Sequence, residues 1–152
     1  MARHQQRFGQ RGDHIACRHR FDGEQIEARR AGAAAYVGEG KTRWAAAHVS
    51  DVAKLYVRAL ERGESGARYH ASAEEGVDAR TIAEAIGKGA GLPVRSIATD
   101  EIERYYGWMA PFAALDMTAS SAWTRARLGW EPTGPDLLTD LAAMDYSEPL
   151  NA

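Results

Sequence analysis

Residues 107–141, GWMAPFAALDMTASSAWTRARLGWEPTGPDLLTDL, carry the densest helix-boundary signals in the chain. The pair Ser120-Ser121 is of a helix-capping type, and Leu128-Gly129-Trp130 is typical of a helix that ends on a left-handed glycine followed by an apolar residue. Pro132 stops that helix from continuing, and Pro135 is expected just inside the next helix, where its missing N–H costs nothing. The stretch therefore predicts a helix, a Gly-Trp-x-Pro corner and a short closing helix.

Upstream of this stretch, short apolar segments alternate with amphipathic ones. Apolar and alternating patterns predict strands at 33–37, 43–49, 68–72 and 94–98, and 3.6-residue periods predict helices at about 50–62, 79–87 and 99–106. Such an alternation is typical of the α/β class. Residues 1–31 show almost no period, so we expect an irregular or divergent arm there and a folded lobe over 32–152.

The helix expected after residue 50 has a wide apolar face. It is predicted to begin at Ser50 or Asp51 and to end at Gly63. Five apolar side chains are expected to point inward from it: Val52, Leu55, Tyr56, Ala59 and Leu60.

Composition and charge exclude several classes of function. The 152 residues are 45% hydrophobic and 26% charged, as in a globular domain, and the net charge of −2 argues against a nucleic-acid or acidic-membrane partner. No apolar run reaches the roughly 20 residues that span a bilayer, and no secretory signal is visible. The single cysteine, Cys17, cannot form an internal disulfide. We therefore expect a cytoplasmic protein.

Three blocks of the chain resemble one enzyme family when they are taken together. They are RWAAAHVSDVAKLYVRALERG (43–63), ARYHASAEEGVDARTIAEAIG (67–87) and the stretch 107–141. In this order and spacing they are similar to the C-terminal half of extended or atypical short-chain dehydrogenase/reductases, the NAD-dependent epimerase/dehydratase group. The resemblance covers roughly residues 33–146. It implies an α/β, Rossmann-like fold of few short strands and about five helices that forms the substrate-binding side of an NAD(P)-dependent oxidoreductase or epimerase.

Two features that the resemblance leads us to expect are missing from the sequence. The family holds its dinucleotide on a glycine-rich strand-to-helix turn, and neither G-x-G-x-x-G nor G-x-x-G-x-x-G occurs here. The family's catalytic tyrosine precedes a lysine by four residues, but Val37, Ser50 and Glu84 precede the three lysines at that spacing. We expect a truncated, substrate-binding part with no catalytic or cofactor-binding residue, which is inactive alone. Its partners would be a small-molecule substrate and either a companion Rossmann-domain chain or further copies of itself.

The candidate substrate-binding residues are Arg43, Trp44, His48, Trp108 and Phe112. His48 is expected where a strand meets its helix, and large apolar residues on an irregular segment, such as Trp108 and Phe112, often line ligand sites. In nucleotide-sugar members of the family, an arginine four residues before the histidine clamps a diphosphate. Trp44 occupies that position here, and an indole cannot form a bidentate clamp, so a nucleotide-sugar substrate is disfavoured.

Other functions remain open from the residues alone. Residues 35–42, AYVGEGKT, fit a loose P-loop pattern in which Lys41 and Thr42 would hold phosphate and Mg²⁺, provided that a helix follows. His14, Cys17 and His19 include metal-ligand types, although three ligands in a basic arm favour a solvated loop. A non-catalytic, self-associating binding module is a further alternative, because loss of a partner domain would expose an apolar face.

Overall fold

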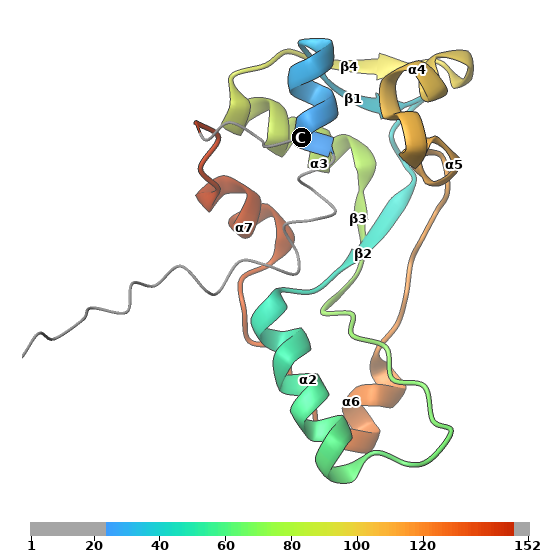
Figure 1. Cartoon of the computed structure of the whole chain (residues 1–152), viewed down its shortest axis with the longest axis vertical. Helices are drawn as coiled ribbons and strands as arrows, with labels where there is room; N and C mark the ends of the chain where they lie inside the picture. Colours follow the sequence, from blue (N-terminus) through green and yellow to red (C-terminus); the bar gives the residue numbers. More distant parts are fainter. Residues whose placement is uncertain (1–23, 148–152) are drawn as a thin grey trace, which may run out of the picture.

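The computed structural model describes residues 24–147. The molecule is elongated, with most strands and helices in an upper region and two helices in a lower one (Figure 1). The elements are β1 (Ala34–Val37), β2 (Arg43–Ala46), α2 (Val49–Arg62), β3 (Glu74–Asp78), α3 (Ala79–Ala90), β4 (Val94–Ile97), η1 (Thr99–Glu101), α4 (Ile102–Tyr106), η2 (Gly107–Met109), α5 (Ala110–Ala113), α6 (Ala122–Leu128) and α7 (Leu137–Ala143).

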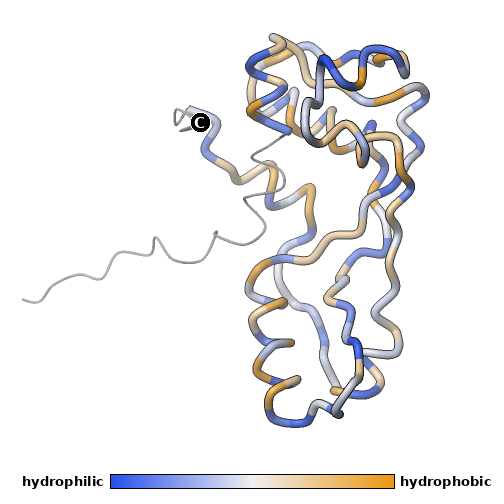
Figure 2. The backbone as a smooth tube through the Cα atoms, turned by 45° about the vertical axis from the view of Figure 1, so that its right-hand side comes forward, coloured by the Kyte–Doolittle hydropathy of each residue, from blue (hydrophilic) through white to orange (hydrophobic). Residues whose placement is uncertain are grey.

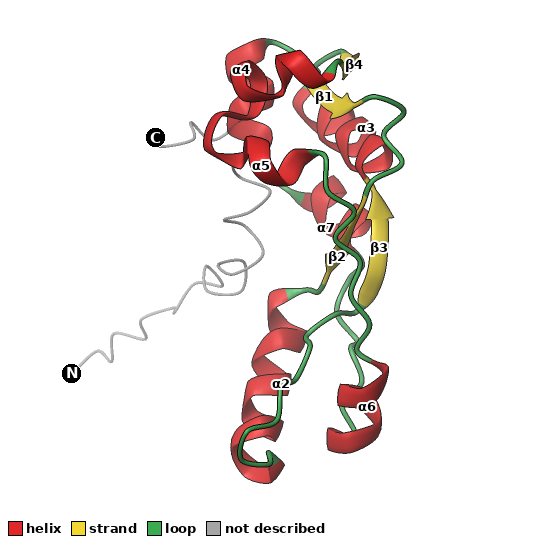
Figure 3. Cartoon of the chain, turned by 90° about the vertical axis from the view of Figure 1, so that its right-hand side faces the viewer, coloured by secondary structure: helices red, strands yellow, loops and turns green. Residues whose placement is uncertain are grey.

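Two small sheets organise these elements. β1 pairs with β4 in parallel, with Ala34 opposite Val94, and β2 pairs with β3 in antiparallel, with Arg43 opposite Asp78. Residues 116–119 run beside the second sheet, because the Met117 N–H donates to the Arg43 carbonyl over 2.7 Å. The second sheet connects the upper region to the lower helices α2 and α6 (Figure 3).

The buried apolar residues of the described part, 24–147, form two clusters. The larger one fills the upper region and includes Ile82 and Ile86 of α3, each 2% exposed, packed with residues of β1, α4 and α7. The smaller cluster lies between the lower helices and consists of Leu55, Leu128 and Trp130. Only three side chains are buried in this lower cluster, so each of them contributes a large share of its packing.

The corner predicted from 107–141 is largely confirmed. The helix α6 follows Ser121 and ends on Gly129 in the left-handed conformation, with φ 58°. The expectation for Pro135 was wrong, because α7 begins at Leu137 and its N-cap is Asp136, whose side chain accepts from the Thr139 N–H. A carboxylate at the N-cap, which accepts from the N–H group three residues later, is the stronger start signal.

The strand expected at 68–72 does not form. The strand of this block lies later, at Glu74–Asp78, where β2 supplies a backbone partner. Within residues 24–147, no backbone–backbone hydrogen bond joins 68–72 to another segment. An extended segment becomes a strand only when a neighbour pairs with its N–H and C=O groups, and local sequence does not report the neighbour.

Helix α2 departs from its expected boundaries and orientation. His48 is its N-cap residue, ahead of Ser50 and Asp51, and Gly63 ends it as predicted. Leu55 is buried, but Tyr56 and Leu60 are 69% and 87% exposed, so the expected inward face was wrong for those two residues. The apolar arc of α2 is wider than the part of it that its own chain covers.

Part of the expected irregular arm is helical. Residues 24–31 form a helix that packs on the upper region, with Ala28 1% exposed and Gln25 2% exposed. The 3.6-residue period in Gln25–Arg30 is faint, which is why most of the arm was expected to lack structure. Residues 1–23 lie outside the described part of the chain.

Among residues 24–147, no helix is long and apolar enough to cross a bilayer.

Candidate functional site

His48 lies where β2 leads into α2. Its Nδ1 is 2.8 Å from the Ser50 hydroxyl and accepts from the Ser50 N–H, which caps the first turn of the helix. Its Nε2 is 4.0 Å from a carboxylate oxygen of Asp140, and its side chain is 11% exposed. The imidazole is thus held on one nitrogen by the helix start, while the other faces Asp140 of α7.

Asp51 is the central polar residue of the same junction. Its side chain is 1% exposed and accepts from the Thr133 N–H at 3.0 Å, the Gly134 N–H at 2.8 Å and the Lys54 ammonium at 3.0 Å. Burial alone favours the neutral acid, but these hydrogen bonds outweigh it and lower the pKa of the Asp51 carboxyl. The carboxylate therefore ties the start of α2 to the corner that follows α6.

Two further contacts make this junction tight. The Trp130 indole N–H donates to the Asp51 carbonyl over 2.9 Å. A Cβ added at Gly134 would lie 2.9 Å from the Asp51 carboxylate and 2.9 Å from the His48 Cβ, which is closer than such atoms pack. Only glycine allows the backbone to approach the carboxylate this closely. Two sequence features could have pointed to this junction: the acidic residue Asp51 in the first turn of α2, and the Pro-Thr-Gly corner at 132–134.

Arg43 is engaged within its own chain. Its guanidinium makes two hydrogen bonds to Asp116, at 3.1 and 2.7 Å, and its backbone N–H donates to the same carboxylate over 2.7 Å. The hydrogen bonds from Arg43 lower the pKa of Asp116. The side chain of Arg43 is 50% exposed, so the pair fixes residues 116–119 beside β2 at the surface.

Trp44 is a core residue. It is 3% exposed and belongs to the main apolar cluster, as do Met109 and Ala113. Alternation along β2 turns the Trp44 side chain inward while Arg43 points outward, so the role of Trp44 as a substrate contact stays a prediction for a residue that is buried in this chain.

Trp108 and Phe112 are the exposed aromatic residues of the upper region. Trp108, on η2, is 75% exposed, and Phe112, on α5, is 46% exposed. Trp108 lines a shallow depression of about 350 Å³ together with Ile102, Glu103, Gly107, Ala110 and Pro111. None of the other four predicted site residues lines this depression. The structure therefore presents the five residues at separate places: two at the surface of η2 and α5, one at the α2 start, one in an ion pair and one in the core.

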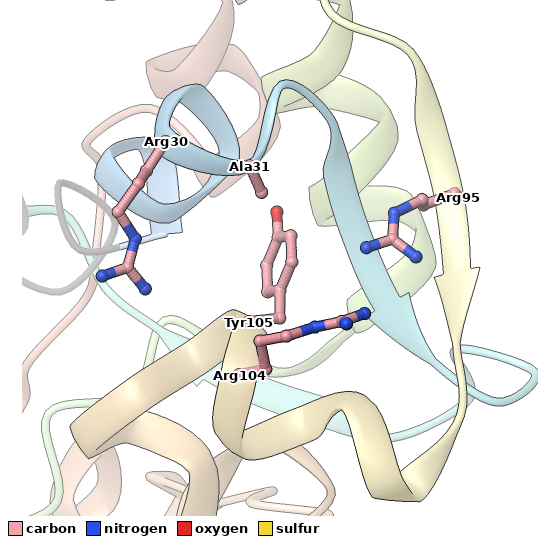
Figure 4. A pocket seen from close by; sticks show the side chains of 5 residues that line it. All are labelled: Arg30, Ala31, Arg95, Arg104 and Tyr105. Atoms are coloured by element: carbon pink, nitrogen blue, oxygen red, sulfur yellow. The ribbon is translucent and has the colours of Figure 1, made fainter.

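A second depression, of about 470 Å³, is lined by three arginines and Tyr105 (Figure 4). Each arginine has a carboxylate partner: Arg30 pairs with Glu27, and both Arg95 and Arg104 pair with Glu101. Two carboxylates thus offset most of the charge of three guanidinium groups, and the depression resembles a solvated ion-pair surface more than a strong anion site.

The two buried tyrosines of α4 are structural. The Tyr105 hydroxyl donates to the Ala33 carbonyl over 2.6 Å, and the Tyr106 hydroxyl donates to the Ala35 carbonyl over 2.7 Å. Burial raises the pKa of Tyr105 to about 12, and burial also raises the pKa of Tyr106. A phenol with a raised pKa stays protonated at neutral pH, which is the opposite of what an acid–base tyrosine needs.

The phosphate-loop alternative does not fit the structure. Residues 38–42 form a turn that leads into the strand β2, whereas a P-loop places its phosphate at the start of a helix. The Lys41 ammonium pairs with Glu39 at 2.6 Å on the surface. The helix that this alternative required at 43–49 is absent.

Within residues 24–147, no group of three or more potential metal ligands comes together. The triplet His14, Cys17 and His19 lies outside the described residues.

The curated relatives match most of this chain but less than half of their own length. No protein-family model matches. An uncharacterized protein of Schizosaccharomyces pombe is 43% identical over 119 residues, which make up 78% of this chain and 40% of that protein. An uncharacterized protein of Saccharomyces cerevisiae is 41% identical over 120 residues, which make up 79% of this chain and 40% of that protein.

Solved structures match the fold over a similar span. RMD from Pseudomonas aeruginosa, complexed with NADPH, aligns with 80% of this chain and 38% of its own, at a TM-score of 0.52 and 22% identity. DesIV, a dTDP-glucose 4,6-dehydratase of Streptomyces venezuelae with NAD and TYD bound, aligns with 78% of this chain and 34% of its own, at a TM-score of 0.57 and 16% identity. The chain therefore has the fold of part of a short-chain dehydrogenase/reductase-type, Rossmann-like α/β protein.

Proposed function

We propose that this chain is the substrate-side part of an NAD(P)-dependent oxidoreductase or epimerase, and that it needs a separate dinucleotide-binding part to act. One observation carries the proposal: the chain shares its fold with proteins solved with NADPH and NAD, yet it corresponds to 38% and 34% of them. The sequence supports the same division, because it has no glycine-rich dinucleotide turn and no lysine four residues after a tyrosine.

Within the proposed assembly, His48, Trp108 and Phe112 are the substrate contacts. The His48 ring is held by Ser50 on Nδ1, and its Nε2, 4.0 Å from an Asp140 oxygen, is the nitrogen that would orient a hydroxyl or carbonyl group. Trp108 and Phe112 offer exposed aromatic surface that a bound ligand can cover. Arg43 and Trp44 act indirectly: Arg43 fixes residues 116–119 through its pair with Asp116, and Trp44 packs in the core. The chemistry is hydride transfer at a carbinol or carbonyl carbon, supplied by the cofactor that the other part holds.

The test is a fluorescence titration with NADPH and NADH. The tagged chain is co-expressed with the part of the Schizosaccharomyces pombe relative that lies outside the matched region, and the co-purified complex is titrated while energy transfer from tryptophan to the nicotinamide is followed. We expect saturable binding by the complex. A complex that forms but binds neither nucleotide contradicts the proposed function.

A second candidate function follows from Tyr56, Val57 and Leu60, which are more than half exposed on α2. Such a face suits a self-associating binding module. Light scattering that shows a stable oligomer of the chain alone, with the α2 face protected from apolar dyes, favours this second function over the first.

A further inference from the structure

The shallow depression at Trp108 combines an exposed indole with an exposed carboxylate. Its six lining residues come from α4, η2 and α5: Ile102, Glu103, Gly107, Trp108, Ala110 and Pro111. Its volume of about 350 Å³ lies within the range of small-molecule sites, roughly 300–1,000 Å³. The helices α4 and α5 lie beside each other in Figures 1 and 3, and hydrophobic and hydrophilic segments alternate along the chain of this upper region in Figure 2. The depression therefore offers a ligand both kinds of surface.

The local fold presents Trp108 to solvent from an anchored backbone. Gly107 ends α4 with a φ of 51°, a conformation that residues with a Cβ rarely adopt. The 3₁₀ helix η2 begins at the same residue, and its Met109 is 3% exposed in the main apolar cluster. Met109 thus ties η2 to the core, while the neighbouring Trp108 stays 75% exposed.

The Trp108 ring has no cation over it from the described residues, which distinguishes it from three other aromatic rings of the chain. An arginine guanidinium lies 5.6 Å from the ring centroid of Tyr36, 5.9 Å from that of Tyr105 and 5.7 Å from that of Trp130. An indole attracts a cation more strongly than a phenol does. Trp108 is thus a cation-binding ring that residues 24–147 leave free.

The carboxylate of Glu103 is unpaired in the described part of the chain. Glu101, two residues earlier, pairs with both Arg95 and Arg104. No Lys, Arg or His of the described residues lies within ion-pair distance of Glu103. Residues 99–116 contain four acidic residues and one basic residue, a net charge of −3. The depression therefore lies in a segment with an excess of negative charge.

These groups select the charge of a ligand. No Lys, Arg or hydroxyl side chain lines the depression, so a phosphate or carboxylate would face Glu103 without a counter-charge. An organic ammonium suits both polar features, since it pairs with the carboxylate and is attracted to the face of the indole. Its alkyl groups can cover the apolar side chains of Ile102 and Pro111.

We propose that this depression binds an organic ammonium group, with Glu103 as its counter-ion and the Trp108 ring over it. The proposal deepens the proposed function, on which it rests, because it gives the small-molecule substrate a positive charge away from the carbinol or carbonyl carbon that reacts. The ammonium orients that substrate and takes no part in hydride transfer.

The experiment titrates the ¹⁵N-labelled full chain with choline and, separately, with 3,3-dimethylbutan-1-ol, an uncharged alcohol of the same shape. We expect choline to cause saturable shifts of the Trp108 indole N–H and the Gly107 amide, with a dissociation constant in the millimolar range because the depression is shallow. The neutral alcohol should bind at least about fivefold more weakly. Higher ionic strength should weaken the binding of choline.

Glu103→Gln has a matched control in Asp100→Asn. Both carboxylates are exposed and lie three residues apart, but Asp100 does not line the depression. We expect Glu103→Gln to weaken the binding of choline about fivefold, and Asp100→Asn to change it less than about twofold. Trp108→Leu keeps an apolar side chain but removes the ring, and should also weaken binding about fivefold. The melting temperature should stay the same in all three variants, because the three sites are exposed.

The proposal is overturned if choline causes no saturable shifts, if choline and the alcohol bind equally, or if the shifts lie away from α4, η2 and α5. Equal effects of Glu103→Gln and Asp100→Asn also overturn it. A co-purified complex that binds neither NADPH nor NADH would instead contradict the proposed function and leave the ammonium site standing.

Discussion

Replacing Asp51 with alanine is expected to lower the free energy of unfolding by about 3 kcal/mol, because two part-buried backbone donors and the Lys54 ammonium lose a buried acceptor. The Thr133 and Gly134 N–H groups both end on this carboxylate, which is 1% exposed, and water cannot readily replace it there. Urea unfolding followed by tryptophan fluorescence measures the change. Asp100→Ala is the matched control, since Asp100 is exposed, and its cost should stay within about 0.5 kcal/mol.

The same variant tests the charge of Asp51. A carboxyl whose pKa is lowered on folding stabilises the protein above its unfolded pKa, here 3.8, and loses that contribution as the pH falls through the folded pKa. The gap in unfolding free energy between wild type and Asp51→Ala should therefore shrink once the pH drops below about 4. A gap that stays constant from pH 7 to pH 2 contradicts the description of Asp51 as a buried, hydrogen-bonded anion.

Trp130→Ala is expected to cost about 3–5 kcal/mol and to loosen the whole lower region. Trp130 is fully buried, and the other buried members of the lower cluster are Leu55 and Leu128, with three partly buried side chains packed against them, so few neighbours can collapse into the space it leaves. Trp130→Phe keeps most of the ring volume but removes the N–H that bonds the Asp51 carbonyl, and should cost about 1–2 kcal/mol.

The control for Trp130 is Trp108→Ala, because Trp108 is 75% exposed. Its cost should lie within about 0.5 kcal/mol. Amide hydrogen exchange shows which region is destabilised. Trp130→Ala should speed exchange in α2 much more than in α3. If Trp130→Ala and Trp108→Ala lower the free energy of unfolding equally, the lower cluster does not depend on Trp130.

Elements whose signals are local could be predicted from the sequence. The left-handed Gly129 after α6, the strand Ala34–Val37 and the end of α2 at Gly63 each depend on residues within a few positions. The strand expected at 68–72 failed for the opposite reason, because strand formation depends on a distant backbone partner. The pattern in α2 showed a broad apolar arc but carried no information about which half is covered.

The candidate site divides in the same way. His48 was identified correctly as the residue at the β2–α2 junction, which a strand-to-helix boundary locates. The bonds of Asp51 to residues 82 and 83 positions later, and the pair of Arg43 with Asp116, 73 positions later, have no local signature. The sequence did not show that Arg43 is ion-paired and Trp44 buried, because their neighbours lie on distant segments of the chain.

NMR spectroscopy of the ¹⁵N-labelled chain, titrated with NADPH in the absence of any other polypeptide, most directly tests the separation of a substrate-side part from a cofactor-binding part. The amide signals of residues 24–147 should not change as the nucleotide is raised to millimolar concentration. A saturable set of shifts that clusters on one surface of the chain would show that it holds the dinucleotide alone, and would contradict that separation.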